Sequence, residues 1–320
     1  MKRFFALALA LACLLALSGC APSPTAVTVG GRKVDASEYA FYLHYNCDAH
    51  EDASVPYSDA ETAAAREKAL KQIVTGEIVR LKCEKYGLTL SKAATKKLKS
   101  DKAALIDSLG GKAAYVDYLR ESCLTDRAYD KFQQGAVYYQ MLYDYIAKKT
   151  DYTDEALRQY FADSFLTLKY IRFPTVDESG APLSDSALAA VRTEAEGVLA
   201  RAQSGEDFDT LVQTYGGAAN GSTGMIVSKL EAIGIDYLEN AFLLDPNTVD
   251  GLYECSDGLY ILERLPLDAT YYEENQDYIR QSALDLAFSQ KLDEWKKDAK
   301  VSVSDVVDDI TLNNVHDYVK

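Results

Sequence analysis

The chain has 320 residues, of which 48% are hydrophobic and 26% are charged, values that are ordinary for globular domains. This length suffices for two domains, and the composition excludes a wholly disordered chain, a collagen-like chain and a polytopic membrane protein. Lys and Arg number 34 against 49 Asp and Glu, so the net charge is −15. Because this is the wrong sign for binding a phosphate backbone, we expect no nucleic-acid partner.

The N-terminus has the pattern of an export signal. Lys2 and Arg3 precede an uncharged apolar run from Phe4 to Leu17, which is too short to span a bilayer comfortably but suits the core of a signal peptide. The run ends in Leu17-Ser18-Gly19-Cys20, which resembles a bacterial lipobox.

The lipobox resemblance implies cleavage before Cys20 and lipidation of its thiol. We therefore expect residues 1–19 to be a signal peptide and residues 20–27 to be a tether. The mature chain would then lie outside the cytoplasm, anchored to the bacterial cell membrane. The alternative is an uncut anchor with a chance cysteine.

Four further cysteines follow the tether, at Cys47, Cys83, Cys123 and Cys255. They permit three disulfide pairings, and export makes pairing possible. None lies in a CxxC or other metal-ligand spacing, so the first expectation is buried free thiols, and we predict neither a metal site nor a cofactor.

The first part of the chain is predicted to be helical after a short hairpin or strand at 27–34. A helix is expected from Asp35, and others at about 59–86, 91–108, 112–122 and 125–149. One face of the 59–86 helix is formed by Leu70, Ile73, Val74, Glu77, Ile78 and Leu81. Gly87 is placed as its C-terminal cap.

Tyrosines concentrate in this helical part, where 14 of the 23 lie between Tyr39 and Tyr160. Ordinary half-buried packing is one interpretation. Tyrosine also supplies broad amphipathic contact area at low entropic cost, which suits a groove that accepts many peptides. Both interpretations stay open.

The pattern changes at a capped short helix from Thr153. A strand is expected at 166–173, helices at about 186–203 and around Phe208, a Gly-rich loop at 216–224, and strands around 249–253 and 259–265. The predicted order is β-α-α-loop-α-β-β. A last helix at about 271–300 has a stripe of Leu284, Phe288, Leu292 and Trp295, and Val301–Val303 is a small strand.

Four short segments in this order resemble a parvulin-type (PpiC-type) peptidyl-prolyl isomerase domain. They are the strand 168–173, Gly205-Glu206-Asp207-Phe208 between two helices, Ala241-Phe242 before a Pro-containing turn, and the strand 258–262. With the lipoprotein leader, the helical region and the Trp-bearing helix, the chain resembles the PrsA/SurA class of extracytoplasmic foldases over nearly all of residues 20–303.

This resemblance implies an α+β fold. A helical chaperone-like region at 28–152 is completed by the C-terminal helix and tail at 267–320, which pack back on it. A parvulin-like β-α-α-α-β-β domain at 153–266 is inserted between them. The implied function is a membrane-anchored folding factor that assists unfolded or proline-containing exported polypeptides.

Prolyl isomerisation needs a site that favours a twisted amide, because the barrier of about 18–20 kcal/mol is loss of resonance. An apolar cup for the proline ring and a few polar groups near the carbonyl meet this need without a cofactor. In parvulins the polar groups commonly include two histidines. None of the three histidines of this chain, His44, His50 and His316, lies in the parvulin-like segment.

The resemblance places Tyr170 and Tyr260 at the two histidine positions. Their hydroxyls can each donate and accept a hydrogen bond, so they are catalytic candidates. The alternative is that both are structural replacements in a site that has lost most activity. The proline cup maps to Thr223, Met225, Ile233, Tyr237 and Phe242, and Asp257 and Cys255 are minor candidates near the last strand.

Two functions therefore stay open: a working isomerase, and a non-catalytic chaperone whose parvulin-like domain only binds unfolded chains. The missing histidines favour the second. A solute-binding lipoprotein would need repeated βαβ units, which the first 150 residues lack. A Ser-His or Cys-His hydrolase would need a histidine in the candidate domain.

Overall fold

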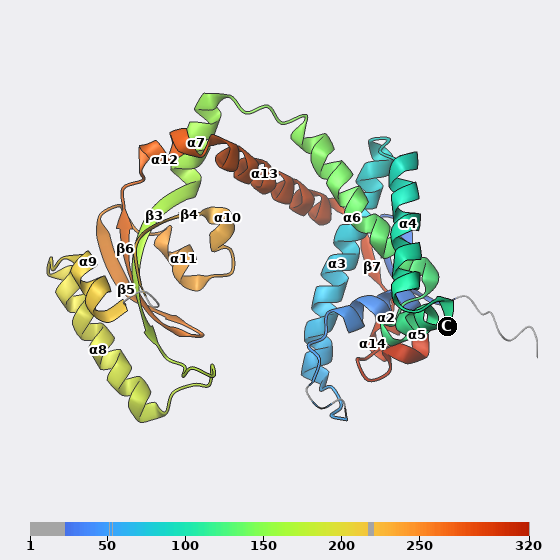
Figure 1. The fold of residues 1–320 in the computed structure, drawn as a ribbon, viewed down its shortest axis with the longest axis horizontal. Coiled ribbons are helices and arrows are strands. Elements are labelled where there is room, and N and C mark those ends of the chain that lie inside the picture. The colour runs from blue at the N-terminus through green and yellow to red at the C-terminus, as the bar shows by residue number, and fades with distance from the viewer. Residues whose placement is uncertain (1–22, 51, 53, 217–220, 320) are drawn as a thin grey trace, which may run out of the picture. The chain divides into compact units, whose positions relative to one another are not determined.

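The computed structural model describes residues 23–50, 52, 54–216 and 221–319, which divide into two compact units. The helical unit comprises Met1–Lys149 and Phe288–Lys320, and the sheet unit comprises Thr150–Ala287. Each unit contains one small antiparallel sheet among helices (Figure 1), so the fold is α+β as expected.

The helical unit has a three-stranded sheet in the order β2-β1-β7. Its elements are β1 (Thr25–Val29), β2 (Arg32–Asp35), α2 (Ala36–Tyr45), α3 (Asp59–Lys85), α4 (Lys92–Ser108), α5 (Lys112–Glu121), α6 (Asp126–Ala147), the second half of α13 (Gln276–Asp298), β7 (Val301–Val303), α14 (Val306–Asp309) and the 3-10 helix η2 (Val315–Tyr318). The sequence predicted a hairpin or strand at 27–34, which is the hairpin β1–β2, and the small C-terminal strand, but not that β7 pairs with β1.

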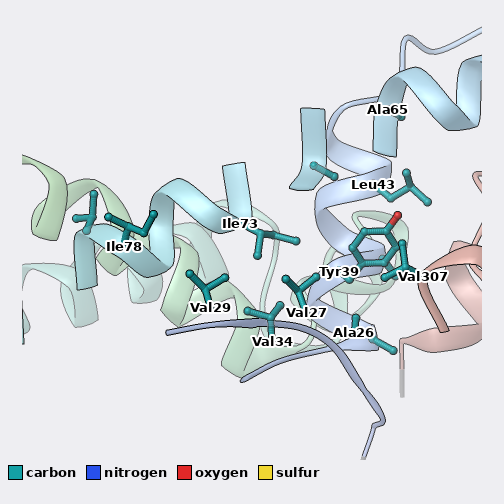
Figure 2. Close-up of a cluster of buried hydrophobic side chains, with 14 of the residues drawn as sticks. Ala26, Val27, Val29, Val34, Tyr39, Leu43, Ala65, Ile73, Ile78 and Val307 are labelled. Atoms are coloured by element: carbon teal, nitrogen blue, oxygen red, sulfur yellow. The ribbon is translucent and has the colours of Figure 1, made fainter. Parts of the chain in front are cut away.

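The core of this unit lies between the hairpin and the helices. Val27, Val29 and Val34 are fully buried, and Figure 2 shows their side chains next to Ile73 and Ile78 of α3. The stripe residues Phe288, Leu292 and Trp295 of α13 belong to the same core. Apolar burial therefore joins the N-terminal strands to the end of the chain.

A buried carboxylate links four elements of this unit. Glu77 of α3 is 3% exposed. Its Oε2 accepts a hydrogen bond from Arg32 Nε of β2 at 2.7 Å, and its Oε1 lies 2.8 Å from Lys131 Nζ of α6. Lys131 also pairs with Glu38 of α2 at 2.6 Å. Burial raises the pKa of Glu77, but the hydrogen bonds from Lys131 and Arg32 outweigh it and lower this pKa overall.

Glu77→Gln should therefore destabilise the helical unit by about 2 kcal/mol, since it removes the buried charge that Arg32 and Lys131 share and leaves them only Glu84 and Glu38. A carboxyl whose pKa is lowered by folding contributes stability above its unfolded pKa of about 4.3, and this contribution is lost as the pH falls further. The variant should consequently lose less stability than the wild type between neutral and acidic pH. Urea unfolding at a series of pH values measures both effects.

Glu84→Gln is the matched control. Glu84 pairs with the same Arg32 at 2.6 Å but its side chain is 65% exposed, so its loss should change stability by about 1 kcal/mol at most. Equal effects of the two substitutions would contradict the assignment of Glu77 as the link between these elements.

The sheet unit has a four-stranded antiparallel sheet in the order β4-β3-β6-β5. Its elements are α7 (Asp154–Ser164), β3 (Phe165–Pro174), α8 (Asp185–Gln203), α9 (Phe208–Leu211), the π-helical turn η1 (Val212–Gly216), β4 (Gly221–Ser228), α10 (Lys229–Ala232), α11 (Asp236–Ala241), β5 (Thr248–Cys255), β6 (Gly258–Leu265), α12 (Ala269–Glu274) and the first half of α13.

Helices cover both faces of this sheet, with α8 and α9 on one side and α10 and α11 on the other (Figure 1). Alternation along the strands assigns the side chains to the faces. Ile171 and Ile261 pack toward α8 and α9, whereas Leu168 and Leu262 pack toward α10 and α11. The candidate tyrosines therefore share the second face.

Three local features differ from the sequence predictions. The segment expected as a Gly-rich loop and mixed region contains strand β4, which pairs with β3. Its glycines and serines favour a turn locally, but β3 supplies partners for its backbone. The helix expected at 271–300 is divided at Asn275 into α12 and α13. The sheet unit extends beyond the predicted 153–266 to Ala287, because Tyr272 and Ile279 pack against α7.

None of the helices in the described part of the chain is long and apolar enough to cross a membrane. Cys20 and the predicted signal peptide lie outside the described residues.

Candidate functional site

The sheet brings Tyr170 and Tyr260 together on one face. In the β3–β6 register Arg172 lies opposite Tyr260 and Tyr170 opposite Leu262, so both tyrosines point the same way. Their ring centroids are 5.9 Å apart. Tyr237 of α11 stacks on Tyr260 at 4.1 Å and lies 5.8 Å from Tyr170. We call these three residues the tyrosine cluster.

A carboxylate holds the Tyr260 hydroxyl. This hydroxyl donates to Asp257, whose oxygens lie at 3.1 and 3.2 Å, and Arg172 donates to the same carboxylate at 2.6 Å. Burial, followed by the negative charge of Asp257 and the hydrogen bond to it, raises the pKa of Tyr260 above its ordinary value. The phenol therefore stays protonated and serves as a hydrogen-bond donor to Asp257.

The residues predicted to form the proline cup are only partly assembled. Met225, Tyr237 and Phe242 are half-buried and pack against the same core as Tyr170 and Tyr260. Ile233 follows α10, is 65% exposed and does not belong to that core. The side chain of Thr223 lies outside the described part of the chain. The minor candidate Cys255 packs against the core as well.

This geometry limits the access of a substrate to the tyrosine cluster. Tyr260 is 6% exposed and its ring is covered by Tyr237. A prolyl ring can therefore contact Tyr260 only if Tyr237 moves away. Arg172 and the Tyr260 hydroxyl are both hydrogen-bonded to Asp257.

Asp257→Asn tests this arrangement. The substitution removes the negative charge beside Tyr260, so the pKa of Tyr260 should fall, while burial keeps it above its ordinary value. It should also cost about 1 kcal/mol of stability, a modest value because Asp257 is partly exposed. Carbon-13 NMR of labelled tyrosines in the wild type, the variant and Tyr260→Phe assigns the titration. An unchanged Tyr260 pKa would show that Asp257 does not hold this hydroxyl.

The helical unit carries a second candidate site, a groove with a volume of about 920 Å³. Residues from α2, α3 and α6 line it: Tyr42, Tyr45, Asn46, Lys68, Lys71, Gln72, Thr75, Gly76, Val79, Phe132, Gln133, Gly135, Ala136, Tyr139 and Gln140. We call it the α2–α3–α6 groove. Tyr45 and Tyr139 are 56% and 44% exposed, and the ring of Phe132 lies 5.7 Å from that of Tyr45. The groove thus presents aromatic surface to solvent.

Small residues open this groove. Gly76 lies in the middle of α3 and Gly135 in the middle of α6, and a Cβ atom added at either would meet nothing within 4 Å. Glycine within a helix is unfavourable by roughly 0.5–1 kcal/mol relative to alanine. Neither turn geometry nor close backbone packing requires these two glycines, so a larger side chain would fit at either position.

The rim of the groove is basic in an acidic protein. Lys68 and Lys71 lie on it, and none of the described residues that line the groove is Asp or Glu, although the chain has a net charge of −15. An apolar floor beside two cations favours a ligand with apolar side chains next to a negative charge.

Sequence patterns pointed only partly to these sites. Tyrosine density in the helical region was compatible with a groove or with ordinary packing, and Gly76 and Gly135 inside predicted helices are the signal that could have located the groove. Arg172 was missed, although its position two residues after Tyr170 in a predicted strand puts it on the same face.

No protein-family model and no curated protein matches the chain. Among solved structures, the PrsA peptidyl-prolyl isomerase of Bacillus anthracis is similar with a TM-score of 0.37 and 14% identity, covering 71% of this chain and 94% of that one. A SurA-like chaperone of Campylobacter jejuni has a TM-score of 0.33 and 10% identity, covering 88% and 100%. The foldase PrsA of Streptococcus pneumoniae has a TM-score of 0.32 and 15% identity, covering 77% and 87%.

These solved structures are of the class that the sequence resembles. At TM-scores below 0.5 they add no argument to those made from the residues themselves.

Proposed function

We propose that this chain is a membrane-anchored extracytoplasmic folding factor that binds unfolded segments of exported polypeptides in the α2–α3–α6 groove. The lipobox-like sequence at Cys20 supports the anchor and the location. The observation that carries the binding function is the groove itself, which is aromatic, open and basic at its rim.

The chemistry of the groove suits ligands that vary in sequence. Apolar contact is non-directional, so it accepts many side chains, and Tyr45, Phe132 and Tyr139 offer large contact areas. The long side chains at the rim, Lys68 and Gln140 among them, can adapt to different ligands. The preferred occupant is an extended segment with aromatic or aliphatic side chains beside an acidic residue, because Lys68 and Lys71 attract its charge.

Gly135→Leu is the direct test of groove binding. The added side chain projects into open space, so the helix should remain folded while the groove is filled. Affinity for a fluorescent peptide rich in Phe and Asp should fall about tenfold or more, which corresponds to about 1.4 kcal/mol. Fluorescence anisotropy measures the affinity, and the ability to suppress aggregation of a chemically unfolded protein should fall in parallel.

Gly197→Leu is the matched control, since Gly197 lies within α8 of the sheet unit and an added Cβ there also meets nothing within 4 Å. It should leave peptide affinity unchanged. Equal binding by wild type and Gly135→Leu would exclude the groove as the client site. A preference for basic over acidic peptides would contradict the proposed role of Lys68 and Lys71.

The second candidate function is prolyl isomerisation in the sheet unit. The observation in its favour is the hydrogen-bonded set of Tyr260, Asp257 and Arg172 beside the half-buried Met225 and Phe242. Such a site could hold a prolyl ring on apolar surface and offer donors to the twisted amide. The stacked position of Tyr237 on Tyr260 opposes fast turnover, so we place client binding first.

Exchange measurements on short Xaa-Pro peptides separate the two functions. We expect little acceleration over the uncatalysed process, which takes tens of seconds, and little change in Tyr170→Phe or Tyr260→Phe. Tyr215→Phe is the control, since Tyr215 packs on the opposite face of the sheet. Clear acceleration by the wild type that is lost in Tyr260→Phe but kept in Tyr215→Phe would establish an isomerase instead.

A further inference from the structure

Two of the three histidines of the chain meet a buried cysteine in the helical unit. His44 lies near the end of α2, Cys123 follows α5, and His316 lies in η2. One ligand atom of each residue lies within 4.8 Å of the others. The Cys123 Sγ atom is 3.3 Å from His316 Nδ1, and the imidazole rings are 5.6 Å apart.

The backbone at Cys123 is unusual for a cysteine. Its φ angle is +53°, in the left-handed region that favours glycine. The amides of Cys123 and Leu124 bond to the carbonyls of Arg120 and Leu119, which is the Schellman arrangement at the end of α5, where glycine is the usual residue. The turn would therefore form more easily with glycine. What cysteine contributes here, and glycine would not, is its side chain, which is fully buried next to His316.

The chemical types of these three side chains indicate which cation they would bind. One thiolate and two imidazoles form a donor set that suits Zn²⁺, a borderline-soft ion with no preferred geometry of its own. Bond lengths of about 2.3 Å to sulfur and about 2.0–2.1 Å to nitrogen put neighbouring ligand atoms roughly 3–4 Å apart. The separations in the cluster are close to this range, so small side-chain rotations complete the site.

We propose that His44, Cys123 and His316 form a Zn²⁺ site in which a water molecule takes the fourth position. Cys123 binds as the thiolate, so its proton is released to solvent when the ion binds, and both histidines bind as neutral imidazoles. His316 is exposed, which gives the ion a path from solvent.

A nucleophilic role for the same residues is less consistent with the geometry. A catalytic cysteine must reach its substrate, whereas Cys123 is fully buried; of the trio, His316 is exposed and His44 is half-buried. The proposed site instead has a structural effect, because its ligands come from α2, from the segment after α5 and from η2 near the C-terminus. A bound ion would cross-link the C-terminal segment of the chain to the N-terminal helices.

Cobalt binding is the direct test, because a Co²⁺ ion bound by a thiolate gives a sulfur-to-metal charge-transfer band in the near ultraviolet. The soluble chain from residue 21 contains every described residue and would be titrated after reduction of its thiols. We expect one equivalent of Co²⁺ to produce the band and one equivalent of Zn²⁺ to displace it. Zn²⁺ should also raise the melting temperature, since the assembled site binds it more tightly than the unfolded chain does.

Cys123→Ser should abolish the thiolate band. His316→Gln lies at an exposed position, so the fold should remain intact. Losing a residue that only hydrogen-bonds to a metal ligand weakens metal binding roughly 10–100-fold. Because His316 is itself a proposed ligand, its loss should weaken Zn²⁺ binding by more than this. His50→Gln is the matched control, since His50 pairs with Glu61 outside the cluster. Cys47→Ser is a second control, because the Cys47 thiol lies near Cys123 without belonging to the trio.

Absence of a thiolate band in the reduced wild type would overturn the proposal. So would a band that survives Cys123→Ser, or one that His50→Gln or Cys47→Ser removes. Variants that retain the melting temperature of the metal-free wild type show that a lost band reflects a lost ligand and not a lost fold.

Discussion

The charge balance at Glu77 is the constraint on which the helical unit depends. A carboxylate that is 3% exposed must be paired, because an isolated buried charge is strongly unfavourable. Arg32 of β2 and Lys131 of α6 supply the pairing, and Lys131 extends it to Glu38 of α2. Strand β2 and the three helices that line or flank the groove are thus held in one arrangement.

The ends of the described chain are joined by a second set of interactions. Strand β7 pairs with β1, and Trp295 of α13 belongs to the core of the helical unit. The helical unit is therefore built from both ends of the described chain. A Zn²⁺ ion bound by Cys123 and His316 would add a cross-link between the C-terminal segment and the rest of the helical unit.

The two candidate sites differ in how they meet solvent. The tyrosine cluster is a hydrogen-bonded packing site in which Tyr260 is covered by Tyr237. The groove displays Tyr45 and Tyr139 to solvent over an open volume. Exposed aromatic surface is costly to leave unpartnered and marks binding sites. This contrast is why we propose client binding ahead of isomerisation.

Local patterns determined much of this protein. Periodicity and capping residues located helices α3 to α6 and α8 to within a residue or two, because an amphipathic helix records its buried face in the sequence. Strand alternation located β3 and β6, but the pairing register that places Tyr170 and Tyr260 on one face came from the structure. The lipobox-like motif at Cys20 is likewise a property of the sequence alone.

Other features required the tertiary structure, because their partners are distant in the chain. The glycine-containing strand β4 is extended only because β3 supplies its hydrogen bonds. Glu77 falls on the predicted apolar face of α3, and nothing near it in the sequence identifies Arg32 or Lys131 as partners. Cys123 and His316 are 193 residues apart, so no ligand spacing could predict a metal site there. Local sequence determines local periodicity, whereas folding alone decides which distant side chains meet.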